Sequence, residues 1–399
     1  MKKYFLFLLL FNIKICFSSY ANLASTVDTF RIDFFSNEYI FHINKDSIRV
    51  AFSELRNTKN NHGGIPTNLL ESSVNKINLL QKELKLGDWL VYQLIRRVAE
   101  KINSKYENYT DYTITKYALL SALGYEPLIY TSDKKILLYI KSTDTVYNLP
   151  IKNINGVQYI CLNYHDYQYQ INFQIEKFYR QFDFIKNEGK NFTYTLSYLP
   201  SFKRNSYVEK KISFVYKNNE EIFKVLVNKD MQDYFTNYPV TEYRYQFNIP
   251  FSEITYQTLI PDLKARIQEF SISKGIEYIM FFVRDGFEFE TDTKLFGREK
   301  RLSAEETLIS NSSDCEDRSA LFFSLVKELY QLPMAILSYP EHVNVAVALP
   351  VKKKNTIQIN NLFYTICEPT PQKRKRGIGW IPRTIKNQPY EIAYTFEHK

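Results

Sequence analysis

The stretch from Ser313 to Glu368 constrains the fold of this chain more than any other, because its chemically active side chains stand at the ends of expected elements. Ser313 or Asp314 can cap a helix that begins at Cys315 and ends near Tyr330. Apolar residues recur along that helix at the spacing of one buried face: Leu321, Phe322, Leu325, Val326 and Leu329. The sequence therefore places a cysteine in the first turn of an amphipathic helix.

Three strands are predicted after this helix: Met334 to Tyr339, His342 to Leu349, and Leu362 to Cys367. A turn at Pro340-Glu341 separates the first two. The middle strand alternates, with Val343, Val345, Val347 and Leu349 on one face and His342, Asn344, Ala346 and Ala348 on the other. Such alternation is typical of a strand in an antiparallel sheet.

The lengths of these elements bring three polar side chains to one edge of the sheet. The helix is about 24 Å long, and a six-residue strand spans about 20 Å. Because the helix and the first strand run antiparallel, Cys315 lies where Tyr339 ends and His342 begins. If the third strand pairs antiparallel with the second, Glu368 returns to the same edge. This is the layout that a Cys–His–acid nucleophilic triad needs.

The order Cys, His, acid on a helix followed by antiparallel strands resembles the transglutaminase-like superfamily, which shares the papain-like core. Within it, the chain is similar to a bacterial secreted group over roughly Ser252 to Lys399. The motifs that carry the likeness are Phe296-Gly297-Arg298-Glu299-Lys300, Glu305-Glu306, Ser313-Asp314-Cys315-Glu316-Asp317-Arg318, His342-Val343 and Ile366-Cys367-Glu368-Pro369-Thr370.

The resemblance implies an α+β domain in which Cys315 is the nucleophile, His342 the base and Glu368 the third member. Relatives of this kind usually carry Asp at the third position, so Glu368 is one methylene longer. They also carry a polar residue, often Gln, near the end of an upstream helix. The matching position here is Arg284, a candidate oxyanion or substrate contact.

Each of these residues also has a plainer interpretation. Cys315 can be a small inert core thiol, His342 a satisfied histidine at a strand edge, and Glu368 an exposed carboxylate at a strand end. A helix N-terminus stabilises a thiolate, whereas Glu316 and Asp317 repel it. Arg318 is expected to neutralise one of these acids. The remaining stabilisation of a thiolate at Cys315 would come from an imidazolium at His342. Cys367 is expected to be structural.

The chain begins with the pattern of a secretory signal peptide. Two lysines precede an apolar run, Tyr4 to Ile13, and Ser19-Tyr20-Ala21 offers a cleavage site. The sequence thus predicts a signal peptide over 1–21 and export to the periplasm or beyond the cell, with an N-terminal membrane anchor as the alternative. No later segment approaches the ~20 apolar residues of a membrane span.

The net charge and the number of cysteines limit the classes of function that this chain could have. The leader holds three lysines and no acid, so its removal lowers the net charge from +9 to +6. The dense basic runs, Lys352–Lys354 and Lys373–Arg376, are interpreted as solvated loops, which argues against nucleic-acid binding. Three cysteines remain in the mature chain, an odd number that leaves at least one free thiol.

No His or Cys cluster has zinc-ligand spacing, so neither a metal nor a cofactor is expected. The expected partner is a protein or peptide substrate, and the oligomeric state is left open.

The N-terminal part, 22–165, has the same order of helix and strands as the region around Cys315. Helices are predicted over Val74–Leu84, Trp89–Ile102 and Tyr112–Leu123, and strands over Pro127–Tyr130, Lys135–Ile140 and Tyr159–Leu162. The positions that match the triad are Asn108 to Thr110, Lys134 or Lys135, and Leu162. None of these supports thiol chemistry, so this part is interpreted as an inactive copy, with coincidence of generic α+β patterning as the alternative.

Between the two parts, 166–250 is predicted to be strands throughout, at sandwich-like spacing: Tyr167–Phe173, Asn191–Tyr198, Val208–Val215, Ile222–Val227 and Tyr243–Ile249. The overall expectation is an α+β chain with a transglutaminase-like domain over 251–399. Its expected activity is cysteine-dependent acyl transfer at peptide or amide bonds, as a hydrolase or a transglutaminase. The alternative is a non-catalytic secreted scaffold with a decayed site.

Overall fold

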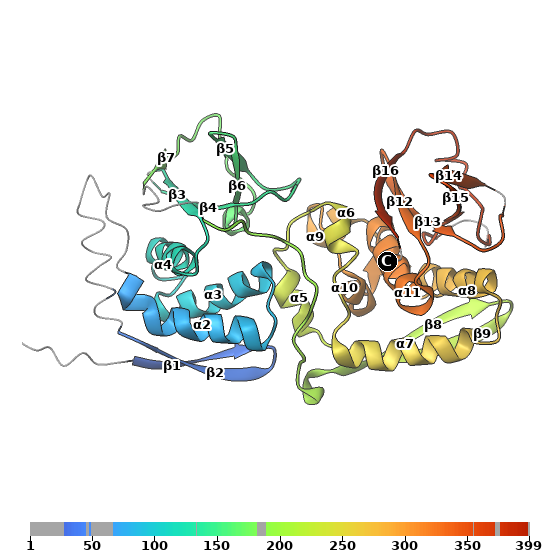
Figure 1. Ribbon diagram of the computed structural model, residues 1–399, viewed down its shortest axis with the longest axis horizontal. Helices are drawn as coiled ribbons and strands as arrows, with labels where there is room; N and C mark the ends of the chain where they lie inside the picture. Colours follow the sequence, from blue (N-terminus) through green and yellow to red (C-terminus); the bar gives the residue numbers. More distant parts are fainter. Residues whose placement is uncertain are drawn as a thin grey trace, which may run out of the picture.

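A computed structural model of the chain describes residues 28–44, 48, 67–132, 134–181, 189–353, 355–371 and 376–397. The signal peptide predicted over 1–21 lies outside the described residues. The fold is α+β, as predicted, and consists of two halves that lie side by side (Figure 1). Among the described helices, none has both the length and the apolar character needed to cross a membrane.

The first half opens with a hairpin, continues through three main helices and ends in a sheet. Its elements are β1 (Asp28–Phe34), β2 (Asn37–Ile43), η1 (Thr67–Leu70), α2 (Glu71–Glu83), α3 (Asp88–Ile102), α4 (Tyr109–Ala122), β3 (Pro127–Thr131), β4 (Ile136–Lys141), β5 (Ile151–Ile154), β6 (Val157–Cys161), η2 (Tyr164–Tyr167), β7 (Tyr179–Arg180) and η3 (Arg204–Ser206).

The second half repeats this plan with extra short elements. It contains β8 (Val208–Tyr216), β9 (Asn219–Val227), α5 (Asp230–Phe235), α6 (Tyr243–Gln246), α7 (Glu253–Ile267), α8 (Ile272–Asp285), β10 (Glu288–Phe289), α9 (Asp292–Phe296), α10 (Ala304–Ile309), β11 (Ser312–Ser313), α11 (Cys315–Tyr330), β12 (Met334–Tyr339), β13 (His342–Ala348), β14 (Thr356–Ile359), β15 (Leu362–Cys367) and β16 (Glu391–Phe396).

The two sheets share one topology. The first has the strand order β5-β6-β4-β3-β7, and the second has β14-β15-β13-β12-β16. If the strands of each sheet are counted along the chain from the helix that precedes it, both orders become third, fourth, second, first, fifth. Each half stacks its sheet on helices and the helices on a two-stranded hairpin (Figure 1). The internal repeat predicted from the sequence is therefore confirmed at the level of topology.

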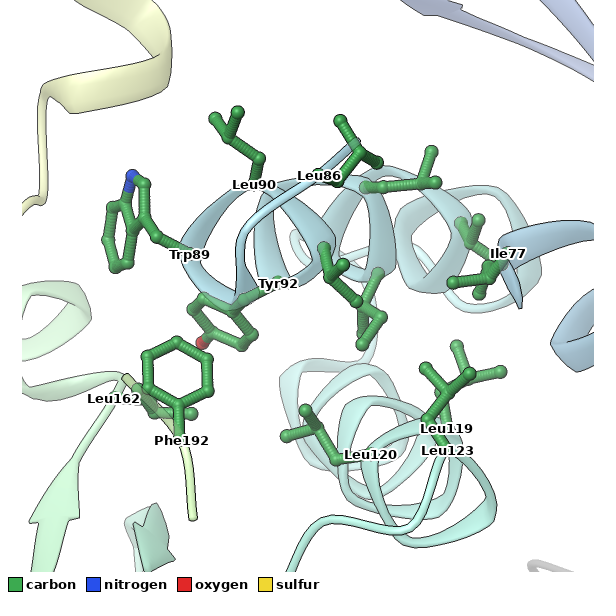
Figure 2. Close-up of a cluster of buried hydrophobic side chains, with 14 of the residues drawn as sticks. Ile77, Leu86, Trp89, Leu90, Tyr92, Leu119, Leu120, Leu123, Leu162 and Phe192 are labelled. Carbon is green, nitrogen blue, oxygen red and sulfur yellow. The ribbon is translucent and has the colours of Figure 1, made fainter. Parts of the chain in front are cut away.

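Each sheet buries its helix-facing side in a large core and its other side in a smaller cluster. Figure 2 shows part of the first of these cores: Leu119 and Leu120 point from α4 toward α3, and Trp89, Leu90 and Tyr92 of α3 belong to the same cluster. Because burying one such side chain stabilises a fold by roughly 1.5–3 kcal/mol, this contact fixes the helix pair beneath the sheet.

The second core confirms the alternation expected in the strand that begins at His342. Val343, Val345 and Val347 pack on the helix side of the sheet, against α11. Ala346 lies in the cluster on the opposite face. The register is therefore the one that places His342 at the strand edge next to α11.

The prediction of a β-sandwich over 166–250 is wrong. Among the described residues of this segment, β8 and β9 form a two-stranded hairpin, and the two-residue strand β7 joins the edge of the first sheet. The stretch 191–198 forms no strand, and Tyr243–Gln246 is helical. Alternating tyrosines and apolar residues favour a strand, but here they bury side chains from loops and short helices, as Tyr194 and Tyr238 do in the first core.

The hairpin β8–β9 belongs to the second core rather than to a separate domain. Its inward side chains pack with those of α7 and α8 in one cluster: Ile212, Phe214, Tyr216, Phe223, Val225 and Val227. The packed unit around Cys315 therefore begins near Tyr207, ahead of the boundary at residue 251 that the sequence suggested.

We expect a fragment that starts at Tyr207 to unfold cooperatively and one that starts at Pro250 to be unfolded or far less stable. Removing six buried side chains costs on the order of 10 kcal/mol, which is comparable to the whole stability of a domain, about 5–15 kcal/mol. Thermal unfolding followed by circular dichroism compares the two fragments with the mature chain. Equal melting temperatures for the two fragments would contradict this assignment of the hairpin.

Candidate active site

The N-terminus of α11 is held by a reciprocal cap. The Asp314 carboxylate accepts a hydrogen bond from the Asp317 backbone N–H at 3.2 Å, and the Asp317 carboxylate accepts one from the Asp314 N–H at 3.4 Å. Two otherwise unpaired donors are thereby satisfied. The cap predicted from the sequence is confirmed, and it fixes Cys315 as the first residue of the helix.

His342 and Glu368 meet as the strand order predicted. His342 pairs with Tyr339 at the end of the β12–β13 hairpin, and β15 runs antiparallel to β13, with Cys367 opposite Val345. Glu368 follows β15, and its Oε2 lies 2.8 Å from His342 Nε2. Its other oxygen accepts a hydrogen bond from the backbone N–H of Thr370 at 3.0 Å.

The Cys315 thiol donates to a carboxylate that the sequence analysis treated only as a repulsive charge. Its Sγ lies 2.8 Å from Glu316 Oε2. Burial raises the pKa of the thiol well above its usual 9.0, and the carboxylates of Glu316 and Asp314 raise it further. A backbone hydrogen bond from Val343, the residue after His342, acts in the opposite direction. The free protein therefore keeps a proton on this thiol.

The pKa of the His342 imidazole is shifted in the direction that favours the protonated ring. Burial lowers its pKa, but the hydrogen bond and charge of Glu368, followed by the charge of Glu316, outweigh burial and hold the pKa above its usual 6.5. Glu316 acts on both the thiol and the imidazole, so the two groups share one electrostatic neighbourhood. With Nε2 engaged by Glu368, the ring has Nδ1 left for another partner.

Arg284 lies behind Glu368 and holds its backbone. The guanidinium is 2% exposed and donates from Nε and Nη2 to the Glu368 carbonyl oxygen, at 3.1 and 2.5 Å. Its Nη1 donates to the carbonyl oxygen of Arg376 at 2.7 Å. These bonds give Arg284 a positioning role for Glu368, and its contact with substrate stays a prediction.

Arg318 does not neutralise Glu316 or Asp317 through an ion pair, contrary to expectation. It is fully buried, and within the described part of the chain its guanidinium donates to carbonyl oxygens of Ser313, Val283, Arg284, Phe287 and Glu288. These bonds join the C-terminal end of α8 to the start of α11. Burial lowers the pKa of Arg318 to about 10.

The residues of the upstream motifs form buried ion pairs and hydrogen bonds within the protein. Lys300 forms a buried ion pair with Glu306 at 3.1 Å, and Glu306 also completes a capping box with Ser303 at the start of α10. Glu305 accepts hydrogen bonds from the backbone and the hydroxyl of Ser252 at the start of α7. The motif therefore holds the helices around the site.

A cluster of carboxylates beside Cys315 was missed by the sequence analysis. Oxygens of Asp292, Asp314 and Asp317 lie within 4.8 Å of one another, and Oδ1 of Asp292 is buried without a hydrogen-bond partner. Burial and mutual repulsion raise the pKa of Asp314 to about 8, and burial raises that of Asp292 to about 7. Such a donor set suits a hard divalent cation. Asp292 is 22 residues before Asp314, so no local motif reveals the cluster.

The first half carries different chemistry at the equivalent positions. Tyr109 begins α4 as Cys315 begins α11. The bond that closes each hairpin, from Ala348 N to Pro333 O and from Lys141 N to Glu126 O, aligns His342 with Lys135.

The strand pairing then aligns Glu368 with Asn163, one residue beyond the Leu162 expected from the sequence. Asn163 Nδ2 donates to the Tyr109 hydroxyl at 2.7 Å, and that hydroxyl donates to Asp166 at 2.7 Å. A tyrosine–asparagine–aspartate network thus occupies the place where the second half holds its thiol and carboxylate.

The other two described cysteines are poor nucleophiles. Cys161 and Cys367 are fully buried and free, whereas Cys315 is partly exposed. Burial raises the pKa of Cys161 to about 12 and that of Cys367 above its usual range. Cys367 packs in the second core, in agreement with its predicted structural role.

Comparison with known proteins adds no assignment, because no protein-family model, no curated protein and no solved structure matches this chain.

We expect Glu316→Gln to shift the pH profile of Cys315 alkylation to lower pH. The amide removes a negative charge beside the sulfur, so the thiolate forms more easily and the iodoacetamide rate near pH 8 rises, by up to about tenfold for one pKa unit. Rates are read by peptide mapping of the folded protein.

Glu341→Gln is the matched control, because Glu341 is an exposed carboxylate next to His342 in sequence. Its profile should follow that of the unsubstituted chain. An unchanged or upward-shifted profile for Glu316→Gln would contradict the electrostatic account of the thiol.

Proposed function

We propose that the second half is a thiol-dependent acyl-transfer enzyme, with Cys315 as nucleophile, His342 as base and Glu368 as the group that orients the imidazole. One observation carries this proposal: Glu368 Oε2 bonds His342 Nε2 at 2.8 Å, at the sheet edge next to the helix that begins with Cys315. A buried carboxylate on one ring nitrogen leaves the other nitrogen free for proton transfer, as triad chemistry requires.

The proposed reaction starts with a protonated thiol. His342 Nδ1 takes the Cys315 proton as Sγ attacks the carbonyl carbon of a peptide or carboxamide. Collapse of the tetrahedral intermediate breaks the C–N bond, and the imidazolium returns the proton to the leaving amine. The remaining thioester is then released by water or by a second amine, with His342 again holding and returning a proton. Atoms and charges balance without a cofactor.

The oxyanion in this reaction needs donors close to the sulfur. Cys315 is the first residue of α11, so its backbone N–H has no helical carbonyl four residues earlier to donate to. This N–H and the positive end of the helix dipole suit the negative oxygen of a tetrahedral intermediate. Arg284 would support catalysis indirectly, by fixing the backbone of Glu368.

A non-catalytic scaffold is the second candidate, and one observation favours it. The Cys315 thiol donates to Glu316, and its pKa lies well above the usual range. A thiol of this kind reacts slowly unless a bound substrate or the imidazole draws its proton away. The two candidates differ in whether reactivity at Cys315 depends on His342.

We expect Cys315 to be alkylated faster than Cys161 and Cys367 in the folded mature chain near neutral pH, and to slow markedly in His342→Ala. The first difference follows from exposure and the second from loss of the base. Labelling with iodoacetamide and peptide mapping measures all three rates in one sample. Equal rates at the three thiols, or no effect of His342→Ala, would favour the scaffold.

We expect Glu368→Gln to slow acylation of Cys315 about tenfold and Glu368→Ala on the order of a hundredfold. The amide keeps the length of the side chain but loses the charge that favours the imidazolium, and alanine loses both. The burst of p-nitrophenol released from p-nitrophenyl acetate measures acylation without a known substrate. Glu391→Gln, an exposed carboxylate on β16, is the control. Full burst rates in both Glu368 variants would mean that another group orients His342.

A further inference from the structure

A basic cavity lies beside the first core, where α5 packs against the first half, and it is separate from the Cys315 site. It has a volume of about 420 Å³ and lies among β1, α3, α4 and α5. The side chains that matter for its chemistry are Gln93, Arg96, Arg97, Lys101 and Lys105. All five come from α3 or the segment after it, so one helix presents most of the positive charge.

The two arginines of this cavity contact uncharged groups and aromatic rings. Within the described part of the chain, neither guanidinium has a carboxylate oxygen within 4.0 Å. Arg97 stacks over the Tyr234 ring, 4.5 Å from its centre, and donates to the Gln93 carbonyl oxygen at 3.1 Å. Arg96 donates from Nη1 to Gln93 Oε1 at 3.1 Å. The Arg96 guanidinium also makes a side-chain hydrogen bond with Tyr112. A guanidinium carries five N–H donors, so each arginine has more donors than these contacts use.

The acidic side chains on the cavity wall do not offset this charge fully. Asp33, Glu100 and Asp233 also line it. Glu100 Oε2 already accepts a hydrogen bond from the backbone N–H of Lys105 at 2.9 Å. The Lys105 ammonium is paired with Asp166 at 2.5 Å. The lining thus holds four cationic and three anionic side chains, an excess of one positive charge.

A buried amide donor without a partner is the second, independent observation. Gln93 is only 1% exposed, and its Nε2 has no hydrogen-bond partner in the part of the chain that the structure describes. Its Oε1 accepts a hydrogen bond from Arg96, and Gln93 itself lines the cavity. Leaving a buried donor unpaired destabilises the protein, and an acceptor bound in the cavity would satisfy this donor.

A buried lysine lies next to the cavity. Lys116 lies behind Tyr112, a residue of the cavity wall, and its Nζ sits 4.3 Å from the centre of that ring. Among the described residues this Nζ has no hydrogen-bond partner, and the charge of Asp166 acts on it. The ammonium is fully buried, and burial lowers its pKa to about 7.

We propose that this cavity binds an oxyanion, a carboxylate or a phosphate group, through the guanidinium groups of Arg96 and Arg97 and the Nε2 amide of Gln93. Planar guanidinium groups match both anions in geometry, and charge-assisted bonds are the strongest that the cavity can offer. Its volume exceeds that of one such group, so the anion would belong to a larger molecule. The site uses no residue of the thiol chemistry and does not depend on it.

Calorimetric titration of the full mature chain with inorganic phosphate and, separately, with N-acetylalanine tests the proposal and separates the two sources. We expect saturable binding of at least one probe at low ionic strength. Arg96→Gln should weaken it tenfold or more, since a hydrogen bond to a charged group contributes about 1.5–3 kcal/mol. Gln93→Met, which keeps the side-chain length, should weaken it by several-fold.

Lys211→Gln is the control, because Lys211 is an exposed cation on β8 of the other half. Binding of phosphate alone assigns a phosphate ester, and binding of N-acetylalanine alone assigns a peptide carboxylate. If Arg96→Gln does not fold, Gln93→Met decides. No saturable binding of either probe at millimolar concentration, or equal affinity in Gln93→Met and Lys211→Gln, would overturn the proposal.

Discussion

The hydrogen bond between His342 Nε2 and Glu368 Oε2 is the interaction on which the candidate site depends. It joins the start of one strand to the end of another, so it forms only if β13 and β15 pair in the observed register. A slip of one residue would turn Glu368 to the opposite face of the sheet. The apolar alternation of Val343, Val345 and Val347 against α11 prevents that slip.

Two buried arginines connect the position of Glu368 to the packing of α8 and α11. Arg318 binds carbonyl groups at the end of α8, including that of Arg284, and Arg284 in turn binds the carbonyl group of Glu368. Each guanidinium is satisfied by backbone oxygens whose positions depend on how α8 and α11 pack. Removing either would leave several buried acceptors unpaired, at about 1–3 kcal/mol each. The position of the Glu368 carboxylate is thus coupled to the packing of the second core.

The two halves show that the fold does not by itself dictate the chemistry. Both have the same strand order, and both cap the helix that precedes the sheet with a short polar side chain, Asn108 or Asp314. In the first half, Tyr109 and Asn163 bond to each other where Cys315 and Glu368 stand in the second. These polar bonds hold the same junction of helix and sheet without a nucleophile, while an unrelated basic cavity lies among β1, α3, α4 and α5.

The sequence predicted the region around Cys315 better than the linking segment, for physical reasons. Helix α11 and strands β12 and β15 match their predicted bounds because cap, periodicity and turn signals agree there. The strands predicted over 166–250 were mostly wrong. Tyrosines alternate there with apolar residues, which favours a strand, but this local pattern does not show how the side chains pack in the folded protein. The Asp292 carboxylate and the thiol's bond to Glu316 were not predictable, since both depend on side-chain positions set by contacts distant in sequence or by rotamer choice.

The most direct test of this account is an NMR pH titration of the His342 ring in the mature chain and in Glu368→Gln. The chain has only five histidines, so assignment by substitution is practicable. The account predicts a pKa above 6.5 for His342, because Glu368 favours the protonated ring, and a lower pKa once the carboxylate is replaced by an amide. A pKa at or below 6.5 that does not change in Glu368→Gln would show that the two side chains do not interact in solution.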